Sequence, residues 1–460
     1  MKKFTKLIIC LLLCVMSVCL VACDNRSEKD KNFNYPASSG NVYGNGGLAV
    51  RKGNCLYYVN GYQNVDSTTE QGASYVLGSL MIAELDGNGN VITDENKVMK
   101  NDYINTMTDK LCGFEATNLF IGGNYLYFTS PCQEDESENS GSDPVWAKDR
   151  VEFYRIKLDK SSTPEEVYQS TVSYSNLKFE YYYTNGYTYI LIFEQGQSKD
   201  SSTTDALIRV NTSTKESEVI KENVLSYVFA DDADKIFYSF KKDDLYQLNK
   251  YDITTNKSSK FTSKEKDFDI VDVKNNKVFI SYETSYDFVK STDLYVANIS
   301  PKQAFSICVY GVQAYDKTYI SEDAKYFIGI KDNKIKIEKL GVDLKLNKVI
   351  DENAEKITFI GVENGSVVYI DNNNIVKSFS YYKYAEEGTL EIKEHSKIEG
   401  INTTYLDLDD DYVYFYKTVG DNDYLHRINL NDTYVEDETN DQMIGKYLEG
   451  DAPEIEEKEE

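Results

Sequence analysis

A turn pair followed by an apolar and aromatic strand occurs eight times along this chain, and the repeat limits the folds that the chain can adopt. The last five intervals between successive copies are 48, 42, 48, 41 and 46 residues. Four-stranded propeller blades repeat at about 40–50 residues, so these intervals favour that architecture. The residues at the third strand position of the eight copies are Tyr57, Tyr127, Tyr189, Phe237, Phe279, Phe327, Val368 and Tyr414.

The turns and the strands both have the composition that such blades need. Turn pairs such as Gly53-Asn54 and Asn185-Gly186 consist of residues that tolerate the left-handed backbone of two-residue hairpins. Residues 277–282 are apolar or aromatic on both faces, which is typical of a sheet packed between two other sheets. We therefore predict an all-β fold, a β-propeller of four-stranded blades over residues 45–447, with eight blades favoured and seven as the alternative. A pair of β-sandwiches is the other architecture that the pattern allows.

Two polar insertions interrupt the regular spacing. The first two intervals are 70 and 62 residues, because polar stretches at 64–73 and 133–149 lengthen the first two copies. We expect both stretches to leave the blades as loops. The second contains Trp146, the only tryptophan of the chain.

Two copies of the repeat carry a longer pattern. Residues 236–240 read Ile-Phe-Tyr-Ser-Phe and are followed by Leu245-Tyr246, and residues 410–429 end in Leu-His-Arg-Ile-Asn. This pattern resembles the Ile-Tyr-Tyr-Ser-Asn and Leu-Tyr-Arg-Ile-Asp repeat of YWTD-like propellers and of bacterial lipoproteins built from it. The resemblance spans roughly residues 45–447 and implies a propeller, although the Trp-Thr pair of that family is missing.

The N-terminus has the layout of a secretory signal, with lysines at positions 2, 3 and 6 before an apolar run from Leu7 to Leu20. The following residues, Val21-Ala22-Cys23, complete a motif that resembles the lipobox of bacterial lipoproteins. The resemblance implies a signal peptide over residues 1–22, cleavage between Ala22 and Cys23, and a diacylglycerol thioether and an N-acyl group on Cys23. An ordinary signal peptide or an uncleaved anchor helix is the alternative.

These features predict where the protein resides. We expect it to be anchored by lipid to the cell membrane, on the extracytoplasmic face, with a flexible tether over residues 23–44 and an acidic disordered tail over 448–460. The formal charge is −26, and removal of three lysines with the signal gives −26 − 3 = −29. So acidic a chain is not expected to bind nucleic acid.

Four cysteines remain after Cys23. Cys112 and Cys132 flank one predicted hairpin, but the register places Cys132 opposite Glu115, so a disulfide between the two cysteines needs the chain to bend. The bonded and the free state are both open from the sequence. We expect Cys55 and Cys308 to be small buried hydrophobic residues.

The sequence contains few residues that suggest a catalytic or a metal-binding site. The two histidines, His395 and His426, are too few for the usual nucleophilic triads and zinc sites, and we expect them to be structural or exposed. Asp86-Gly87-Asn88-Gly89-Asn90 begins like a calcium loop, but Val91 stands where the loop needs glycine, so a strand-connecting turn is favoured. No metal site and no cofactor are predicted. The tyrosine runs at 181–183 and 381–384 fit either sugar stacking or packing between blades.

The function indicated is a non-enzymatic binding or interaction propeller at the cell surface, with a protein or a glycan as its ligand. Two alternatives are a glycan-active enzyme that uses paired carboxylates and an accessory or sensor subunit of an envelope complex. With seventy-six acidic residues, spacing alone does not single out a catalytic pair.

Replacing Cys23 with alanine tests the anchor. Because only a thiol at this position can form the thioether, Cys23→Ala is expected to abolish incorporation of labelled palmitate and to leave the protein unprocessed or released. Cys55→Ala is the matched control and is expected to retain the label. Labelling that persists in Cys23→Ala would contradict the lipoprotein assignment.

Overall fold

The computed structural model describes residues 33–36, 39–65, 75–92, 106–113, 118–133, 146–196, 205–230, 234–286, 289–331, 334–340, 345–346, 357–409, 411–419, 422–435 and 440–444. The expected signal peptide, the cleavage site at Ala22, the lipidation site at Cys23 and the acidic tail lie outside these residues. Among the residues described, no helix is both long enough and apolar enough to cross a membrane.

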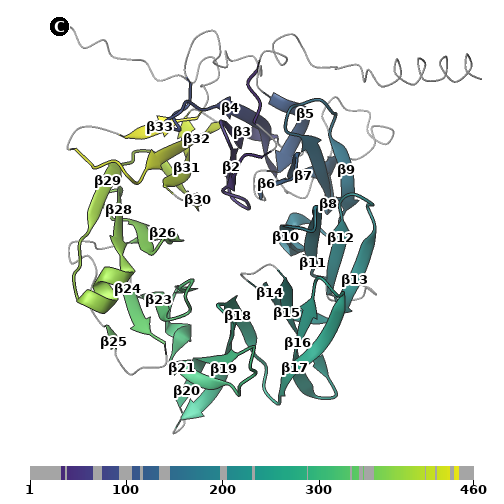
Figure 1. Ribbon diagram of the computed structural model, residues 1–460, viewed down its shortest axis with the longest axis vertical. Coiled ribbons are helices and arrows are strands. Elements are labelled where there is room, and N and C mark those ends of the chain that lie inside the picture. Colours follow the sequence, from purple (N-terminus) through teal and green to yellow (C-terminus); the bar gives the residue numbers. More distant parts are fainter. Residues whose placement is uncertain are drawn as a thin grey trace, which may run out of the picture.

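Eight antiparallel blades, each made of four consecutive strands, form a ring, and this confirms the eight-bladed propeller (Figure 1). Six blades are separate four-stranded sheets, and the first and last blades are joined, together with one added strand, into a nine-stranded sheet. Blade 1 contains β2 (Ala49–Lys52), β3 (Cys55–Val65), β4 (Tyr75–Glu84) and β5 (Thr106–Gly113). Blade 2 contains β6 (Phe120–Gly122), β7 (Tyr125–Gln133), β8 (Trp146–Lys157) and β9 (Glu165–Gln169). Blade 3 contains β10 (Leu177–Thr184), β11 (Tyr187–Glu194), β12 (Ala206–Asn211) and β13 (Ser217–Glu222). Blade 4 contains β14 (Val224–Phe229), β15 (Lys235–Lys242), β16 (Leu245–Asp252) and β17 (Lys257–Lys264).

The other four blades follow the same order. Blade 5 contains β18 (Asp269–Lys274), β19 (Lys277–Tyr286), β20 (Val289–Asn298) and β21 (Ser306–Val309). Blade 6 contains β22 (Lys317–Ile320), β23 (Tyr326–Lys331), β24 (Lys334–Lys339) and β25 (Lys345–Leu346). Blade 7 contains β26 (Thr358–Glu363), β27 (Ser366–Ile370), β28 (Ile375–Ser380) and β29 (Lys393–Lys397). Blade 8 contains β30 (Ile401–Asp409), β31 (Tyr412–Val419), β32 (Asn422–Asn429) and β33 (Asp441–Met443).

A few short elements lie outside the blades. Strand β1 (Val42–Tyr43) pairs with β2, so part of the expected tether over 23–44 belongs to the fold. Phe33 and Tyr35, from the same stretch, pack against the core of blade 1. Two 3-10 turns, η3 (Tyr174–Asn176) and η4 (Val312–Ala314), and the π-helix η5 (Lys383–Glu387) connect strands.

The turn pairs of the repeat set the register of the blades. In six blades, exactly two residues join the first strand to the second, as in the pairings Lys52↔Cys55 and Thr184↔Tyr187. Asn185 and Gly186 have φ angles of 52° and 81°, the left-handed backbone that this hairpin requires. Blades 4 and 6 have longer connections.

The core of the molecule lies between blades. Each blade shares an apolar cluster with the next one, and one cluster joins blades 8, 1 and 2. This arrangement explains why the strands are apolar on both faces. Seven of the eight residues at the third repeat position are buried, whereas Tyr189 in blade 3 is partly exposed.

The ring closes through contacts between blades 1 and 8 and without exchange of strands. Strand β3 meets β32 at the single pair Gly61↔Asp423. The buried hydroxyl of Tyr416 donates a hydrogen bond of 2.7 Å to the carbonyl of Val59. Strand β33 supplies the last strand of blade 8, in a region whose polarity had hidden it in the sequence.

A partly buried carboxylate lies at the same junction. Asp407 on β30 accepts hydrogen bonds from the backbone N–H groups of Leu48, at 2.9 Å, and Leu408, at 3.0 Å. A Cβ added to Gly47 would lie 1.9 Å from Asp407 Oδ2, so the chain approaches this carboxylate as closely as glycine allows. Burial raises the pKa of Asp407 to about 6, and the two hydrogen bonds oppose the shift.

Two details of the sequence reading need correction. Cys112 and Cys132 do not flank one hairpin, because Cys112 lies on β5 of blade 1, opposite Gly78, and Cys132 lies on β7 of blade 2. Their side chains lie outside the description, so the disulfide remains a prediction. Trp146 does not sit within a loop, since it begins strand β8 and pairs with Gln133.

Asp407 makes a prediction about pH. The raised pKa keeps a proton on Asp407 in the folded chain up to about pH 6, whereas an unfolded chain loses it near the ordinary pKa of 3.8. This residue's contribution to the free energy of unfolding is therefore present below pH 4 and is lost, by up to about 3 kcal/mol, as pH rises through 6. Urea unfolding of Asp407→Asn should lack this part of the pH dependence. The exposed-site control Asp244→Asn should retain it, and equal slopes in the two variants would contradict the assignment.

Candidate functional site

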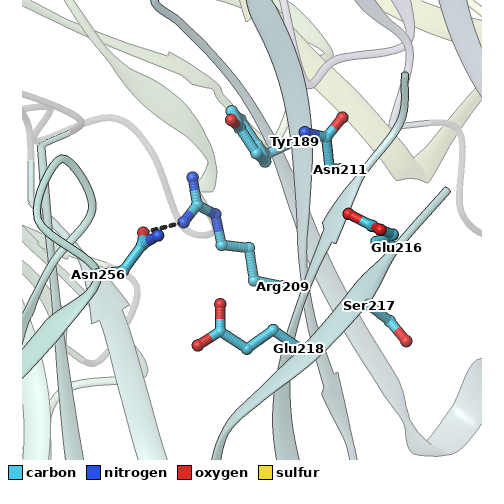
Figure 2. A pocket seen from close by; sticks show the side chains of 7 residues that line it. All are labelled: Tyr189, Arg209, Asn211, Glu216, Ser217, Glu218 and Asn256. Carbon is cyan, nitrogen blue, oxygen red and sulfur yellow. Dashed lines mark hydrogen bonds between the residues drawn. The ribbon is translucent and has the colours of Figure 1, made fainter. Parts of the chain in front are cut away.

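A cavity of about 470 Å³ lies between blades 3 and 4, at the end of blade 3 where β11 begins and β12 ends. Six of its residues come from blade 3 or its β12–β13 turn, and one comes from the β16–β17 turn of blade 4 (Figure 2). The lining residues are Tyr189, Arg209, Asn211, Glu216, Ser217, Glu218 and Asn256.

Strand pairing brings the lining residues together. Tyr189 on β11 pairs with Asn211 on β12, and Arg209, two residues earlier on the same face of β12, pairs with Glu218 on β13. Asn256 reaches the cavity from the next blade and has a φ of 54°, which a tight turn between β16 and β17 requires.

Arg209 is the charged centre of this cavity. Its guanidinium carbon lies 4.0 Å from the centroid of the Tyr189 ring, a cation–π contact. Its Nη1 donates to Asn256 Oδ1, drawn as the dashed line in Figure 2, and to the hydroxyl of Tyr251 at 3.4 Å. The residue is 8% exposed, so these groups hold a cation that is largely removed from water.

Two further polar atoms are buried at this site. They are Nε of Arg209 and the hydroxyl of Tyr182, whose ring stacks on Tyr189 at 5.3 Å. Burial raises the pKa of Tyr182, while the charge of Arg209 and a hydrogen bond with its side chain oppose the shift. Tyr182 and Arg209 therefore support each other beneath the cavity.

Blade 2 contains the same arginine and tyrosine pair, and there an acid of the next strand also binds the arginine. Arg155 lies over the ring of Tyr125 at 4.6 Å and pairs across the strands with Glu165, as Arg209 pairs with Glu218. Here both Nε and Nη2 of Arg155 lie 2.8 Å from Glu165 Oε2. The edge of the guanidinium that carries Nε is therefore occupied by a carboxylate of the same blade.

Blade 8 repeats the arrangement a third time. Arg427 lies over Tyr412 at 4.3 Å, and its cross-strand partner is Gln442. Its Nε donates to Gln442 Oε1 at 2.9 Å, and its Nη2 donates to the carbonyl of Gly89. In this blade the unmatched donor is Nη1, whereas the Nε edge is occupied.

Blade 3 differs because the acid opposite its arginine, Glu218, does not bind the guanidinium. Glu218 is exposed, and within the described part of the chain no hydrogen bond or ion pair joins it to Arg209. Figure 2 shows its carboxylate to one side of the guanidinium, with Tyr189 on the other side. Arg209 consequently lines the cavity without a bond to its cross-strand acid.

The other sequence candidates are structural where they are described. His426 is buried and bonds Asp441 Oδ1 at 2.6 Å, while His395 is buried between Ser378 and the carbonyl of Asp432. Asp86 accepts the N–H groups of Asn88 and Asn90, so the calcium-like segment is a turn. The described residues contain no group of three or more His, Cys, Asp or Glu that could hold a metal ion.

The tyrosine runs divide between packing and surface. Tyr181, Tyr182, Tyr381 and Tyr384 are buried between blades, and Tyr183 and Tyr382 are 49% and 37% exposed. The sequence reading missed Arg209 as a site residue. A signal for it existed, since the third strands of three blades carry arginine at the same register, but the sequence did not show which one lacks its acceptor.

The three arginines are expected to differ in their contribution to stability. Arg209→Met removes a buried cation whose Nε is unmatched, so the free energy of unfolding should change by less than about 1 kcal/mol. Arg427→Met removes bonds to Gln442 and to Gly89 of blade 1, and it should cost about 2–4 kcal/mol. Urea unfolding midpoints measure both, and an equal loss in the two variants would argue that Arg209 is as fully bonded as Arg427.

Comparisons with known proteins extend no further than the fold. No family model matches the chain, and no curated protein sequence matches it. The β-propeller domain of the Trilobed protease from Pyrococcus furiosus is similar at 12% identity, over 72% of this chain and 95% of that one, with a TM-score of 0.43. Dipeptidyl peptidase 4 of Porphyromonas gingivalis is similar at 8% identity, over 86% and 59%, with a TM-score of 0.45. TolB of Acinetobacter baumannii is similar at 12%, over 66% and 77%, with a TM-score of 0.30. At these identities no activity is carried over to this chain.

Proposed function

We propose that this protein is a lipid-anchored, extracytoplasmic binding propeller without catalytic activity, and that the cavity between blades 3 and 4 is its ligand site. The observation that carries the proposal is the cavity itself, which is lined by the side chain of Arg209 and by two exposed acids, Glu216 and Glu218. In blades 2 and 8 the equivalent arginines are bound by Glu165 and Gln442, whereas in the described part of blade 3 no bond joins Glu218 to Arg209. A concave surface with a few polar groups is the usual form of a ligand site.

The character of the acids in the cavity supports binding over hydrolysis. Glu216 and Glu218 line the cavity, so they are the natural pair for a carboxylate mechanism. Both are exposed, whereas a carboxyl that serves as a general acid is usually kept in an apolar pocket. Neither residue has such a pocket in the described structure, and the enzyme alternative therefore lacks a specific observation in its favour.

Export and anchoring fit this role. A tether at Cys23 would hold the ring outside the cytoplasm and leave the end of blade 3 free to meet molecules of the envelope or of the medium. The role of an accessory subunit is compatible with the same site. Crosslinking in intact cells followed by pull-down would separate it from a solitary receptor by the presence of a stable partner.

A bulky side chain at the mouth of the cavity tests the site. Full-length protein in detergent, applied to an array of immobilised saccharides and short peptides, is expected to retain at least one of them. Glu216→Trp fills the cavity and should lower that retention at least tenfold, because the ligand loses access to Arg209. Glu222→Trp, at the far end of strand β13, which begins directly after Glu216, is the matched control and should bind as the parent does. Equal binding by both variants would place the ligand site elsewhere.

A further inference from the structure

We infer that the ring rests on the phospholipid bilayer through the first hairpin turns of blades 1 to 3, with Tyr183 and Tyr187 among the lipid headgroups. This inference rests on the lipid anchor of the proposed function and adds to it a contact surface and an orientation. The position of the tether, two exposed tyrosines and the distribution of charge each support it.

The chain that leads to the anchor leaves the fold beside the first hairpin turn of blade 1. The side chain of Asn54, in that turn, donates a hydrogen bond of 2.6 Å to the carbonyl of Asn34, and Phe33 packs against the core of the blade. Phe33 follows Cys23 by ten residues, and ten extended residues span at most about 35 Å. An acyl group on Cys23 therefore keeps this turn close to the bilayer.

The first turns of blades 1, 2 and 3 lie on one face of the ring, which we call the tether face. Nζ of Lys52 in blade 1 donates a hydrogen bond of 2.6 Å to the carbonyl of Gly123, in the first turn of blade 2. A Cβ added to Gly123 would lie 3.8 Å from the ring of Tyr183 in blade 3. These contacts lead from the tether to the first turn of blade 3, three blades that follow one another in Figure 1.

Two exposed tyrosines flank the first turn of blade 3. Tyr183 and Tyr187 are 49% and 48% exposed. They lie on opposite faces of the blade, because Tyr183 pairs with Thr188 and Tyr187 pairs with Thr184. Tyrosine is enriched at the membrane interface, since its ring is apolar while its hydroxyl remains hydrated. The tip of this hairpin therefore has the side chains that suit the headgroup layer.

The connections of blades 2 and 3 on the tether face carry no net charge. Their first turns contain only glycine and asparagine, and in their third-to-fourth connections Lys160 balances Asp159 and Lys215 balances Glu216. The connection at 134–145 begins and ends at the opposite face and contains five acidic residues. A membrane with anionic lipids repels the acidic face more strongly, so this distribution favours contact through the tether face.

The acids of blade 7 indicate a tilt of the ring. Glu386, Glu387 and Glu391 are exposed in the third-to-fourth connection of blade 7, which lies across the ring from blade 3 (Figure 1). We expect blade 7 to stand away from the bilayer, with blades 1 to 3 nearest to it. Two tyrosines suffice for such a contact, because a short tether raises their effective concentration at the surface to the millimolar range.

This orientation determines how a ligand reaches the cavity between blades 3 and 4. In an antiparallel blade, the turn after the first strand and the turn after the third strand lie at the same end. Glu216 and Asn256 line the cavity from third-to-fourth turns, so the cavity lies at the tether face. A ligand would therefore be met at the surface of the membrane.

Quenching of a single tryptophan by brominated lipid tests the inference. Full-length lipidated protein with Trp146→Phe is reconstituted in vesicles of phosphatidylcholine and phosphatidylglycerol, with phosphatidylcholine brominated in its acyl chains as the quencher. Tyr187→Trp in this background should be quenched several-fold more strongly than Tyr310→Trp. Tyr310 is the matched control, because it is 56% exposed and follows the fourth strand of blade 5, at the opposite face.

A charge beside the introduced tryptophan should weaken the contact. Tyr183→Asp, combined with Tyr187→Trp, should lower the quenching several-fold, because a carboxylate resists entry into the interface, whereas Tyr310→Asp should leave it unchanged. Equal quenching of the two tryptophans, or no quenching of either in protein that floats with the vesicles, would overturn the orientation and leave the anchor in place. Protein that does not float with the vesicles would remove the anchor as well.

Discussion

Burial of apolar side chains between neighbouring sheets is the interaction on which the rest of this structure depends. The strands are apolar on both faces, so each sheet has to be covered twice, and a closed ring is the arrangement in which every sheet has two neighbours. The apolar clusters follow this rule, since each is made by the facing sides of adjacent blades, such as Phe279 of blade 5 with Phe327 of blade 6. Polar side chains are thereby confined largely to strand ends, turns and the edges of blades.

The same constraint explains why a cavity can arise at the end of blade 3. In blades 2 and 8 an arginine of the third strand is held by a tyrosine of the second strand and by an acceptor of the fourth. These sets close the end of a blade with matched polar groups. In blade 3 the acceptor position holds the exposed Glu218, and Asn256 of blade 4 supports Arg209 from the other side. In blade 3 the equivalent arginine therefore lines a cavity, because no acceptor from its own fourth strand binds it in the described structure.

Closure of the ring uses a different set of contacts from those inside the blades. Blades 1 and 8 meet through one strand pair, the Tyr416 hydroxyl and the partly buried Asp407, together with the apolar cluster that the two blades share with blade 2. Because no strand crosses the junction, the closing contacts lie between residues far apart in the chain. The raised pKa of Asp407 is expected to make this junction sensitive to pH, while the proposed ligand cavity lies elsewhere, between blades 3 and 4.

The sequence by itself determined the repeat, the two-residue turns and the strands apolar on both faces, and it favoured eight blades over seven, because these features depend on local backbone preference and on the pattern of apolar residues. It did not determine that Trp146 begins a strand or that Cys112 and Cys132 belong to different blades, since no local pattern fixes where an insertion ends. Only the tertiary structure decided which arginine is left without its acceptor. Arg209 and Asn256 are 47 positions apart. Whether Glu218 turns toward the guanidinium depends on the packing of two blades, which spacing along the chain does not record.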